Sequence, residues 1–330
     1  MGKMESTRYR LIELLEASRE QYVSGQFLSE KLNISRSAIW KHMKELKKDG
    51  YVIEGIRRKG YRIVKSPDKV SENTVQWGLQ TNWLGKQIIH KATTNSTQQV
   101  AHQAARENAE HGTVIIADEQ TEGKGRMERH WHSPKNKGIW MSLILRPPIP
   151  PAAAPQLTLL TATVLADVIT EYTTASPNIK WPNDLLIRDK KTAGILTEMQ
   201  AEQDRIKYVV AGIGINVNHS YDNFPSEISN KATSLKLETG QDLQVVPIIQ
   251  HILRCFERSY DAFIRDGFST IKNKWESYGY KIGEAIKIRT NHEILEATFT
   301  GIAEDGALLV HTDSDGTRKM YSGEIEWFRK

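Results

Sequence analysis

Nine residues, GKGRMERHW at positions 123–131, constrain what this chain can fold into more than any other stretch of its sequence. They lie shortly after Val114–Ala117, an apolar run typical of a buried strand. A loop of this composition can hold an anion, because glycine lets backbone N–H groups approach a ligand and arginine presents a fixed fork of donors. Trp131 adds a flat apolar face. We therefore expect a site for a small anionic ligand with an aromatic base; the alternative is a surface loop with ordinary solvated charges.

A helix start and a glycine-containing strand provide further polar positions. Thr93–Gln98 precedes a helical stretch, so the Ser96 and Thr97 hydroxyls either cap that helix or meet a polar ligand. Val209–Asn218 has the pattern of a strand with two glycines one residue apart, which often marks only a bulge or close packing. It is not the G-x-G-x-x-G of dinucleotide-binding folds.

The segment 179–198 has the pattern of a β-hairpin interrupted by amide and charged side chains. Asn183 and Asp184 alone would mark a turn. With Lys180 and Lys191 beside them, the pair is suited to phosphate and Mg²⁺.

The positive charge of the chain is concentrated at its N-terminal end. Residues 1–65 contain 15 Lys and Arg against 8 Asp and Glu, a net charge of +7, whereas the remainder carries −2. Such asymmetry indicates a nucleic-acid or acidic-membrane partner for that end. Apolar periodicity predicts three helices and two strands, at Tyr9–Leu15, Leu28–Ile34, Arg36–Lys48, Tyr51–Glu54 and Tyr61–Val64.

This order of elements resembles a winged helix-turn-helix domain, in which the second helix of the pair enters the major groove of DNA. Side chains on the outer face of that helix and cations of the hairpin turn would contact bases and phosphates. They are Ser37, Trp40, Lys41, Lys44, Arg57, Arg58 and Lys59. The alternative is a small helical domain that binds protein.

Length and composition indicate a multidomain protein. With 330 residues, two or three domains are expected. No run of about 18 apolar residues and no signal-peptide core is found, so we expect a cytoplasmic protein with no membrane partner. The single cysteine, Cys255, excludes an internal disulfide and a Cys-rich metal site, and we expect it to be buried in a helix. Beyond Trp275, short β-segments separated by glycine-containing turns predict a small β domain.

Four motifs in a fixed order carry a resemblance to a known family. They are G-[RK]-G-R-x-x-R-x-W at 123–131, K-W-P-N-D at 180–184, K-x-A-G-I-L at 191–196 and G-x-G-x-N at 212–216. Together they resemble the biotin protein ligases, and the winged-helix N-terminus resembles the bifunctional members, which also repress biotin genes. The resemblance covers nearly the whole chain.

The resemblance implies an α+β multidomain fold. We expect a winged helix-turn-helix domain (1–65), a linker (66–82), a central mixed α/β ligase domain related to class II aminoacyl-tRNA synthetases (83–276) and a C-terminal SH3-like β-barrel (277–330). It also implies two reactions: biotin and MgATP give biotinyl-5′-AMP and pyrophosphate, and the biotinyl group then passes to a lysine of a biotin carboxyl carrier protein domain. A homodimer bound to biotinyl-AMP would repress at operator DNA.

Motif positions imply roles for individual residues. The biotin-binding residues would be Ser96, Thr97, Gln98, Gln120, Lys124, Gly125, Arg126, Lys191 and Gly194. The ATP-binding residues would be Arg126, Arg129, Trp131, Asn183 and Asn216. Lys191, Arg126 and Asp184 would be catalytic: the cations neutralise charge at the α-phosphate, and Asp184 positions Mg²⁺ or assists the incoming amine.

Three positions depart from the family pattern. Lys124 stands where many members have Arg, which keeps the charge and loses the bidentate geometry. Met127 and Glu128 stand where several members have Arg and Gly. An acidic residue in an anion-binding loop is expected to lower affinity for the adenylate or to pair with Arg126 or Arg129 in the empty site. Two other functions stay open: a transcription factor that senses biotin without ligating it, which Glu128 favours, and a ligase for lipoate.

Overall fold

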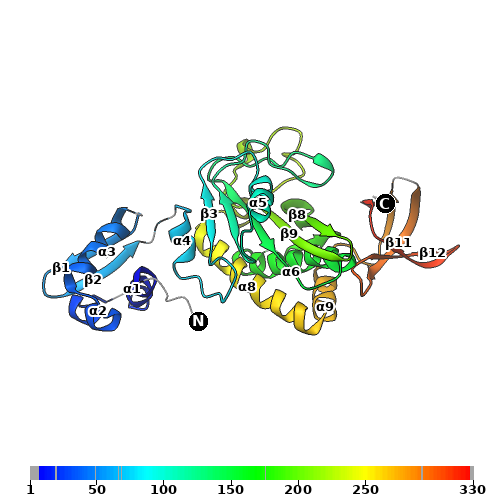
Figure 1. The fold of residues 1–330 in the computed structure, drawn as a ribbon. Coiled ribbons are helices and arrows are strands. Elements are labelled where there is room, and N and C mark those ends of the chain that lie inside the picture. The colour runs from blue at the N-terminus through cyan, green and yellow to red at the C-terminus, as the bar shows by residue number, and fades with distance from the viewer. Residues whose placement is uncertain are drawn as a thin grey trace. The chain divides into compact units, whose positions relative to one another are not determined.

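The computed structural model of the chain describes residues 7–18, 21–48, 50–65, 67, 69–174, 176–290 and 293–327. The chain divides into two compact units (Figure 1). The first comprises Met1–Thr81 with Gln244–Gln250, and the second Asn82–Leu243 with His251–Lys330.

The first unit has the three helices and the hairpin expected of a winged helix-turn-helix domain. Its elements are α1 (Thr7–Glu16), α2 (Gly25–Leu32), α3 (Arg36–Lys48), β1 (Val52–Ile56) and β2 (Gly60–Lys65). Asn33, in the left-handed conformation at φ 53°, ends α2, and the Ser35 hydroxyl accepts a hydrogen bond from the Ala38 N–H at the start of α3. This turn fixes the entry of α3, which buries Ile39, Met43 and Leu46 in the core of the unit.

The stretch 66–82, predicted to be a linker, is largely structured, and this corrects the prediction for its described part. It contains α4 (Glu72–Gln76), which Ser71 caps through the Thr74 N–H. Trp77 is buried in the core of the first unit, with its ring 5.6 Å from that of Tyr51. The polar composition suggested a linker because one capping serine and one large apolar side chain give little periodic signal.

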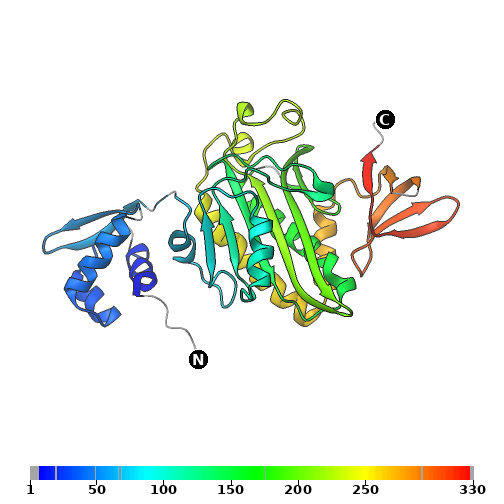
Figure 2. The ribbon, with the colours of Figure 1, turned by 45° about the horizontal axis from the view of Figure 1, so that its top comes forward.

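The second unit is built on a seven-stranded mixed sheet (Figures 1 and 2). Its strands are β3 (Ile88–Lys91), β4 (Val114–Ala117), β5 (Gly138–Leu145), β6 (Asn178–Lys180), β7 (Asp184–Ile187), β8 (Lys190–Glu202) and β9 (Arg205–Asn216). The spatial order is β3-β4-β5-β9-β8-β7-β6; β3 and β4 pair in parallel and the other neighbours pair antiparallel. Every residue of β5 is buried, so both faces of the sheet are covered at its centre.

Helices cover the two faces of this sheet (Figure 2). On one face α5 (Thr97–Arg106) packs on β4, β5 and β9 and buries Ala101 and Ala105. On the other, α6 (Ala154–Tyr172) packs on β6 to β9 and against α9 (Ser269–Tyr278). By length and composition, the helical stretch that includes α6 could cross a membrane, which the sequence prediction overlooked. However, 72% of its apolar window is buried inside the fold, as in a core helix.

The C-terminal part of the second unit forms a separate five-stranded antiparallel sheet, in keeping with the predicted small barrel. Its strands are β10 (Ala285–Arg289), β11 (Ile294–Ile302), β12 (Leu308–Thr312), β13 (Gly316–Met320) and β14 (Glu324–Trp327), in the order β13-β12-β11-β10-β14. Before it come α7 (Leu235–Thr239) and α8 (Val245–Asp266), in which Cys255 is buried as expected. The sequence prediction missed α9 and β14.

Candidate functional site

A pocket of about 760 Å³ opens in the second unit, and every residue predicted for biotin, ATP or a metal lines it. These residues come from the start of α5, the 120–131 segment, the turn before β7, and strands β7, β8 and β9. They are Ser96, Thr97, Gln98, Gln120, Lys124, Gly125, Arg126, Arg129, Trp131, Asn183, Asp184, Lys191, Gly194 and Asn216. Segments distant in sequence thus converge on one site.

The glycine-rich loop is folded back on itself by backbone hydrogen bonds. The Gly125 N–H donates to the Arg129 carbonyl at 2.8 Å, and the Trp131 N–H donates to the Gly123 carbonyl at 2.7 Å. Between them, Met127 and Glu128 adopt left-handed conformations, at φ 55° and 56°. That conformation favours glycine, so a Gly at position 128, as the family pattern has it, would suit the backbone better than glutamate does.

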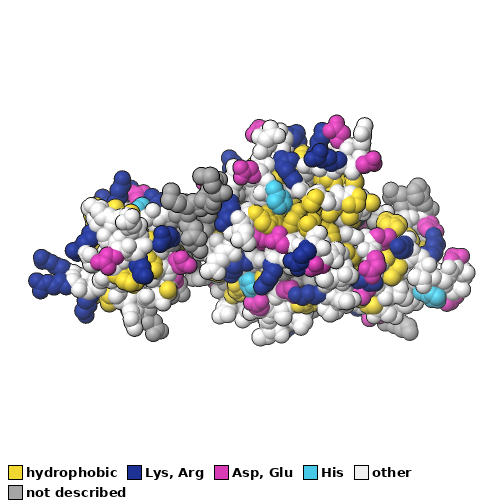
Figure 3. Space-filling model, turned by 60° about the horizontal axis from the view of Figure 1, so that its bottom comes forward, with side chains coloured by type: hydrophobic (Ala, Val, Ile, Leu, Met, Phe, Trp, Pro, Cys, Tyr) yellow, Lys and Arg dark blue, Asp and Glu magenta, His cyan; other side chains and the backbone are white. Residues whose placement is uncertain are grey.

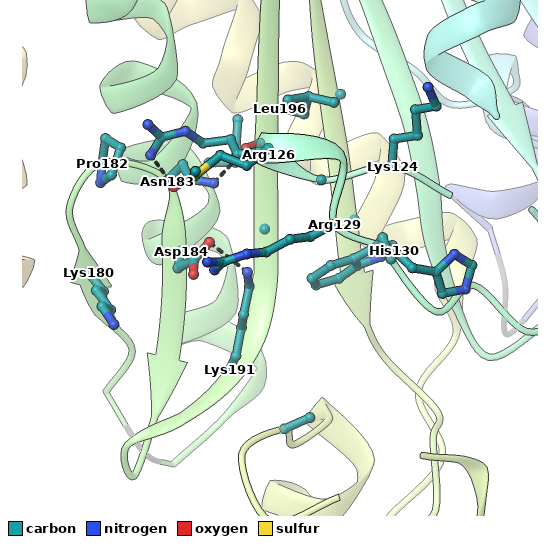
Figure 4. Close-up of a pocket in the computed structure, with 18 of the residues that line it drawn as sticks. Lys124, Arg126, Arg129, His130, Lys180, Pro182, Asn183, Asp184, Lys191 and Leu196 are labelled. Carbon is teal, nitrogen blue, oxygen red and sulfur yellow. Dashed lines mark hydrogen bonds and ion pairs between the residues drawn. The ribbon is translucent and has the colours of Figure 1, made fainter. Parts of the chain in front are cut away.

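Two contacts hold the central cations of the pocket (Figure 4). The Arg126 guanidinium donates to Asn183 Oδ1 at 3.2 Å, and Lys191 Nζ lies 2.8 Å from Asp184 Oδ1. Burial lowers the pKa of Arg126 from its ordinary value. Lys191 Nζ also lies 5.1 Å from the centre of the Trp131 ring. Lys191 therefore contacts both a carboxylate and an indole, where a charged group beside an aromatic base would bind.

The two remaining predicted cations are ion-paired at the rim. Lys124 Nζ lies 2.8 Å from Glu128 Oε2, and Arg129 pairs with Glu324 of β14. The expectation that Glu128 pairs with Arg126 or Arg129 is therefore wrong. The turn brings residues 124 and 128 together, while Arg126 reaches inward to Asn183 and Arg129 reaches the C-terminal sheet.

Glycines in β8 and β9 make room for the side chains of the pocket. A Cβ at Gly212 would lie 2.5 Å from Gln98 Oε1, and one at Gly214 would lie 2.4 Å from Trp131 Nε1. A Cβ at Gly194 would lie 3.1 Å from the Trp131 ring. The close packing that a G-x-G pattern often marks is therefore packing against two predicted ligand-binding residues.

The polar end of the pocket is almost fully desolvated. Ser96, Thr97 and Gln98 are at most 5% exposed. Ser96 caps α5 by accepting from the Gln98 N–H at 3.2 Å, so the capping interpretation of this hydroxyl is confirmed. Gln120 Oε1 accepts from the Thr97 N–H at 2.8 Å, which ties the helix start to the segment before the glycine-rich loop. Buried polar groups held in this way suit a neutral polar ring.

The two predicted asparagines also hold the pocket wall. Asn183 Nδ2 donates to the Ile195 carbonyl at 2.9 Å, and Asn216 Nδ2 donates to the Thr233 carbonyl at 3.1 Å. Their amides are therefore partly committed to the backbone.

Several lining residues were not among the predicted site residues. Lys180, whose pKa burial lowers, was placed beside a phosphate and Mg²⁺ site but not assigned to a ligand. Ser142 is a polar residue in the apolar strand β5, a signal that could have revealed it. Glu324 and Trp327 of β14 line the pocket too, and no local pattern links them to the other site residues, such as Arg129, which is 195 residues upstream of Glu324.

Asp184 is the carboxylate predicted to position Mg²⁺. Across the described part of the chain, no group of three or more His, Cys, Asp or Glu side chains could hold a metal. Mg²⁺ is usually bound by one or two carboxylates together with substrate phosphates. These residues therefore fit an ion that arrives with a nucleotide, not one caged by protein.

The predicted DNA-contacting residues lie on the surface of the first unit. Ser37, Trp40, Lys41 and Lys44 are exposed on α3, and Arg57, Arg58 and Lys59 are exposed in the turn between β1 and β2. Basic side chains cover the tip of the hairpin (Figure 3). Trp40 is 59% exposed, with Lys44 Nζ 5.5 Å from its ring centre. An exposed indole flanked by lysine has no role in the core and suits a nucleic-acid surface.

Comparison with known proteins gives matches along the chain. The model of the biotin/lipoate A/B protein ligase family matches residues 91–216, a helix-turn-helix model matches 7–62, and a biotin protein ligase C-terminal domain model matches 281–327. A protein of Bacillus subtilis (strain 168) called bifunctional ligase/repressor BirA is 48% identical over 98% of this chain and 99% of its own length. The Escherichia coli (strain K12) protein of that name is 28% identical over 95% of this chain and 94% of its own length.

A solved structure agrees with these matches. The structure of a biotin protein ligase from Aquifex aeolicus in complex with biotin and ATP superposes with a TM-score of 0.64. It is 29% identical in sequence, and the alignment covers 74% of this chain and all of that one.

Proposed function

We propose, because the chain belongs to the biotin protein ligase family and matches its bifunctional ligase/repressors over nearly its full length, that it activates biotin with ATP and transfers it to a carrier-protein lysine. The observation that carries this proposal is one pocket with a buried polar end, a lysine and an arginine, and an indole beside the lysine. Biotin, a phosphate group and adenine require these three environments.

In the first reaction, a biotin carboxylate oxygen attacks the α-phosphorus of ATP. A carboxyl–phosphate bond forms as the bond to pyrophosphate breaks, and pyrophosphate leaves. The nucleophile is already ionised, so the protein needs to align the reactants and neutralise charge more than to remove a proton. Lys191 and Arg126 are the cations at the centre of the pocket, and the rim cation Lys124 would leave Glu128 to join them.

In the second reaction, the lysine amine of a carrier domain attacks the acyl carbon of biotinyl-5′-AMP. An amide bond forms, AMP leaves and the amine loses a proton. Asp184, which lies beside Lys191, would position the amine or bind Mg²⁺ with the phosphates. When bound, Mg²⁺ would supply positive charge to the phosphate oxygens.

The first unit would bind operator DNA through α3 and the basic turn. We propose that biotinyl-5′-AMP orders the 123–131 loop and favours a homodimer that spans two half-sites. Operator binding should therefore tighten when biotin and ATP are added, and equal affinity in both conditions would contradict the corepressor role. Arg58→Ala should weaken binding to every DNA sequence and lower the salt slope by about one.

Mass spectrometry of a biotin carboxyl carrier domain, after incubation with the chain, biotin and MgATP, tests the ligase function. Biotin mass on one lysine is expected. Adenylate formation without transfer would favour a biotin-sensing transcription factor, and the observation behind that alternative is the Lys124–Glu128 pair in the loop. Transfer of lipoate in preference to biotin would identify a lipoate ligase.

A further inference from the structure

We propose that Glu198, outside the pocket lining, is a positioning residue that fixes the direction of a hydrogen-bond chain at the polar end of the pocket, so that the lining accepts N–H donors from the ligand ring. The inference rests on the proposed function and names what selects the ring of biotin. Glu198 lies on β8, and its side chain is 46% exposed.

The hydrogen-bond chain begins at the Gln98 carboxamide. Gln98 Nε2 donates to Glu198 Oε2 at 2.8 Å and to the backbone carbonyls of Leu196 and Val210, each at 3.3 Å. A carboxylate only accepts hydrogen bonds, so Glu198 holds the nitrogen of the carboxamide towards itself. Gln98 Oε1 is then the atom that faces Ser142, whose hydroxyl donates to it at 3.1 Å.

The hydrogen-bond chain continues along the pocket wall. Ser142 Oγ and Thr97 Oγ1 are 2.9 Å apart, and the Thr97 hydroxyl is also 3.1 Å from Gln120 Oε1. The Ser142 proton is used on Gln98, and the single Thr97 hydroxyl proton is donated to Gln120 Oε1 or shared between that oxygen and Ser142 Oγ. Both hydroxyl protons are therefore committed within the protein, and oxygen lone pairs remain for a ligand. Thr97 and Ser142 both line the pocket and are 4% and 0% exposed.

Two side chains in turn hold the Glu198 carboxylate. His102 Nε2 lies 3.1 Å from Glu198 Oε2, and Tyr208 Oη lies 3.3 Å from His102 Nδ1. With a carboxylate as its partner, Nε2 must donate, which leaves Nδ1 to accept from the tyrosine. The hydrogen bonds from His102, first, and from Gln98 lower the pKa of Glu198 and keep it an acceptor at neutral pH.

The chemical consequence is selectivity for a ring that carries N–H groups. The ureido ring of biotin has two N–H donors, whereas the dithiolane ring of lipoate has none. Hydroxyls free to rotate could donate or accept and would discriminate poorly. Hydroxyls whose protons are committed leave a dithiolane facing unpaired, desolvated lone pairs, which disfavours it.

The test combines substitutions at two positions of this hydrogen-bond chain, Glu198 and Ser142. Glu198→Met removes the acceptor at nearly constant length and should raise the KM for biotin about tenfold, the size of one hydrogen bond, with kcat and the KM for ATP within twofold. Glu198→Gln keeps an acceptor oxygen and should restore most of the affinity. Ser142→Ala interrupts the chain, so Glu198→Met should add little in its presence. Glu202→Met, at an exposed carboxylate on the same strand that pairs with Lys207, is the matched control.

A second readout separates ring recognition from a general structural effect. Methylating a ureido nitrogen of biotin should cost the parent chain far more affinity than it costs Glu198→Met. Unchanged KM for biotin in Glu198→Met, or additive effects with Ser142→Ala, would overturn the inference. In either case adenylate formation by the parent chain would still support the proposed function, whereas its absence would defeat that function directly.

Discussion

At the scale of single residues, three cations of the pocket are ion-paired with carboxylates, and a bound ligand must replace these carboxylates as their partner. Lys191 is held by Asp184, Lys124 by Glu128 and Arg129 by Glu324. The exposed pairs at the rim contribute little to stability. Their effect is to keep the cations oriented, so a phosphate that enters replaces a carboxylate as the partner.

Lys191→Ala should slow biotinyl-5′-AMP formation by roughly two to four orders of magnitude, because it removes a desolvated charge contact to the transition state. Pyrophosphate release during a single turnover measures this rate. Lys190→Ala is the matched control, since the neighbouring lysine points to the opposite side of β8 and does not line the pocket. A rate within threefold of the parent for Lys191→Ala would remove it from the mechanism.

Glu128→Gly should make biotinyl-5′-AMP dissociate more slowly, by a few-fold. Glycine accepts φ 56° without strain, and Lys124 loses its internal partner. Dissociation of labelled adenylate measures the effect. Glu128→Gln separates the causes, because it removes the charge and keeps the left-handed side chain; faster dissociation in both variants would show that Glu128 helps retention.

At the scale of elements, local pattern predicted most of the fold and family motifs predicted the site. The sequence predicted α3 and β4 to the residue, since each combines a clear period or apolar run with defined ends. It missed α4, α9 and β14. A five-residue helix has little period, and β14 becomes a strand through its pairing with β10. The contribution of Glu324 and Trp327 to the pocket follows from that pairing and could not be predicted from local sequence.

Trp77→Ala tests whether the former linker is part of the first unit. Removing a 5% exposed indole from that core should destabilise the unit by about 3–5 kcal/mol. Residues 7–65 should become sensitive to protease and operator binding should fall, while adenylation continues. Trp40→Ala gives the contrast: it should weaken DNA binding without protease sensitivity, because that indole is 59% exposed. Protease resistance of Trp77→Ala would return this segment to the role of linker.

At the scale of the whole molecule, acid stability depends on a histidine buried beside the pocket. His219 is 0% exposed, stacks on Phe224 with ring centres 4.8 Å apart, and meets the Trp140 ring edge-on at 5.9 Å. Burial, and secondarily the charges of His132 and Lys137, lower its pKa from 6.5 to about 4. Trp140 in turn lies edge-on to Trp131, so protonating this cluster would disturb the wall that supports the indole of the site.

The sign of the pH effect follows from the direction of this shift. Above pH 6.5 the imidazole is neutral in both the folded and unfolded chain, and its full contribution to stability is present. As the pH falls from 6.5 to about 4, the unfolded chain takes up a proton that the folded chain refuses, so stability falls by about 3 kcal/mol in total. His219→Phe keeps the stacked ring and removes the titrating group. In urea unfolding, the loss of stability between pH 7 and pH 4.5 should therefore be smaller in this variant by most of that amount. An equal loss in the two proteins would mean that His219 is protonated in the folded state.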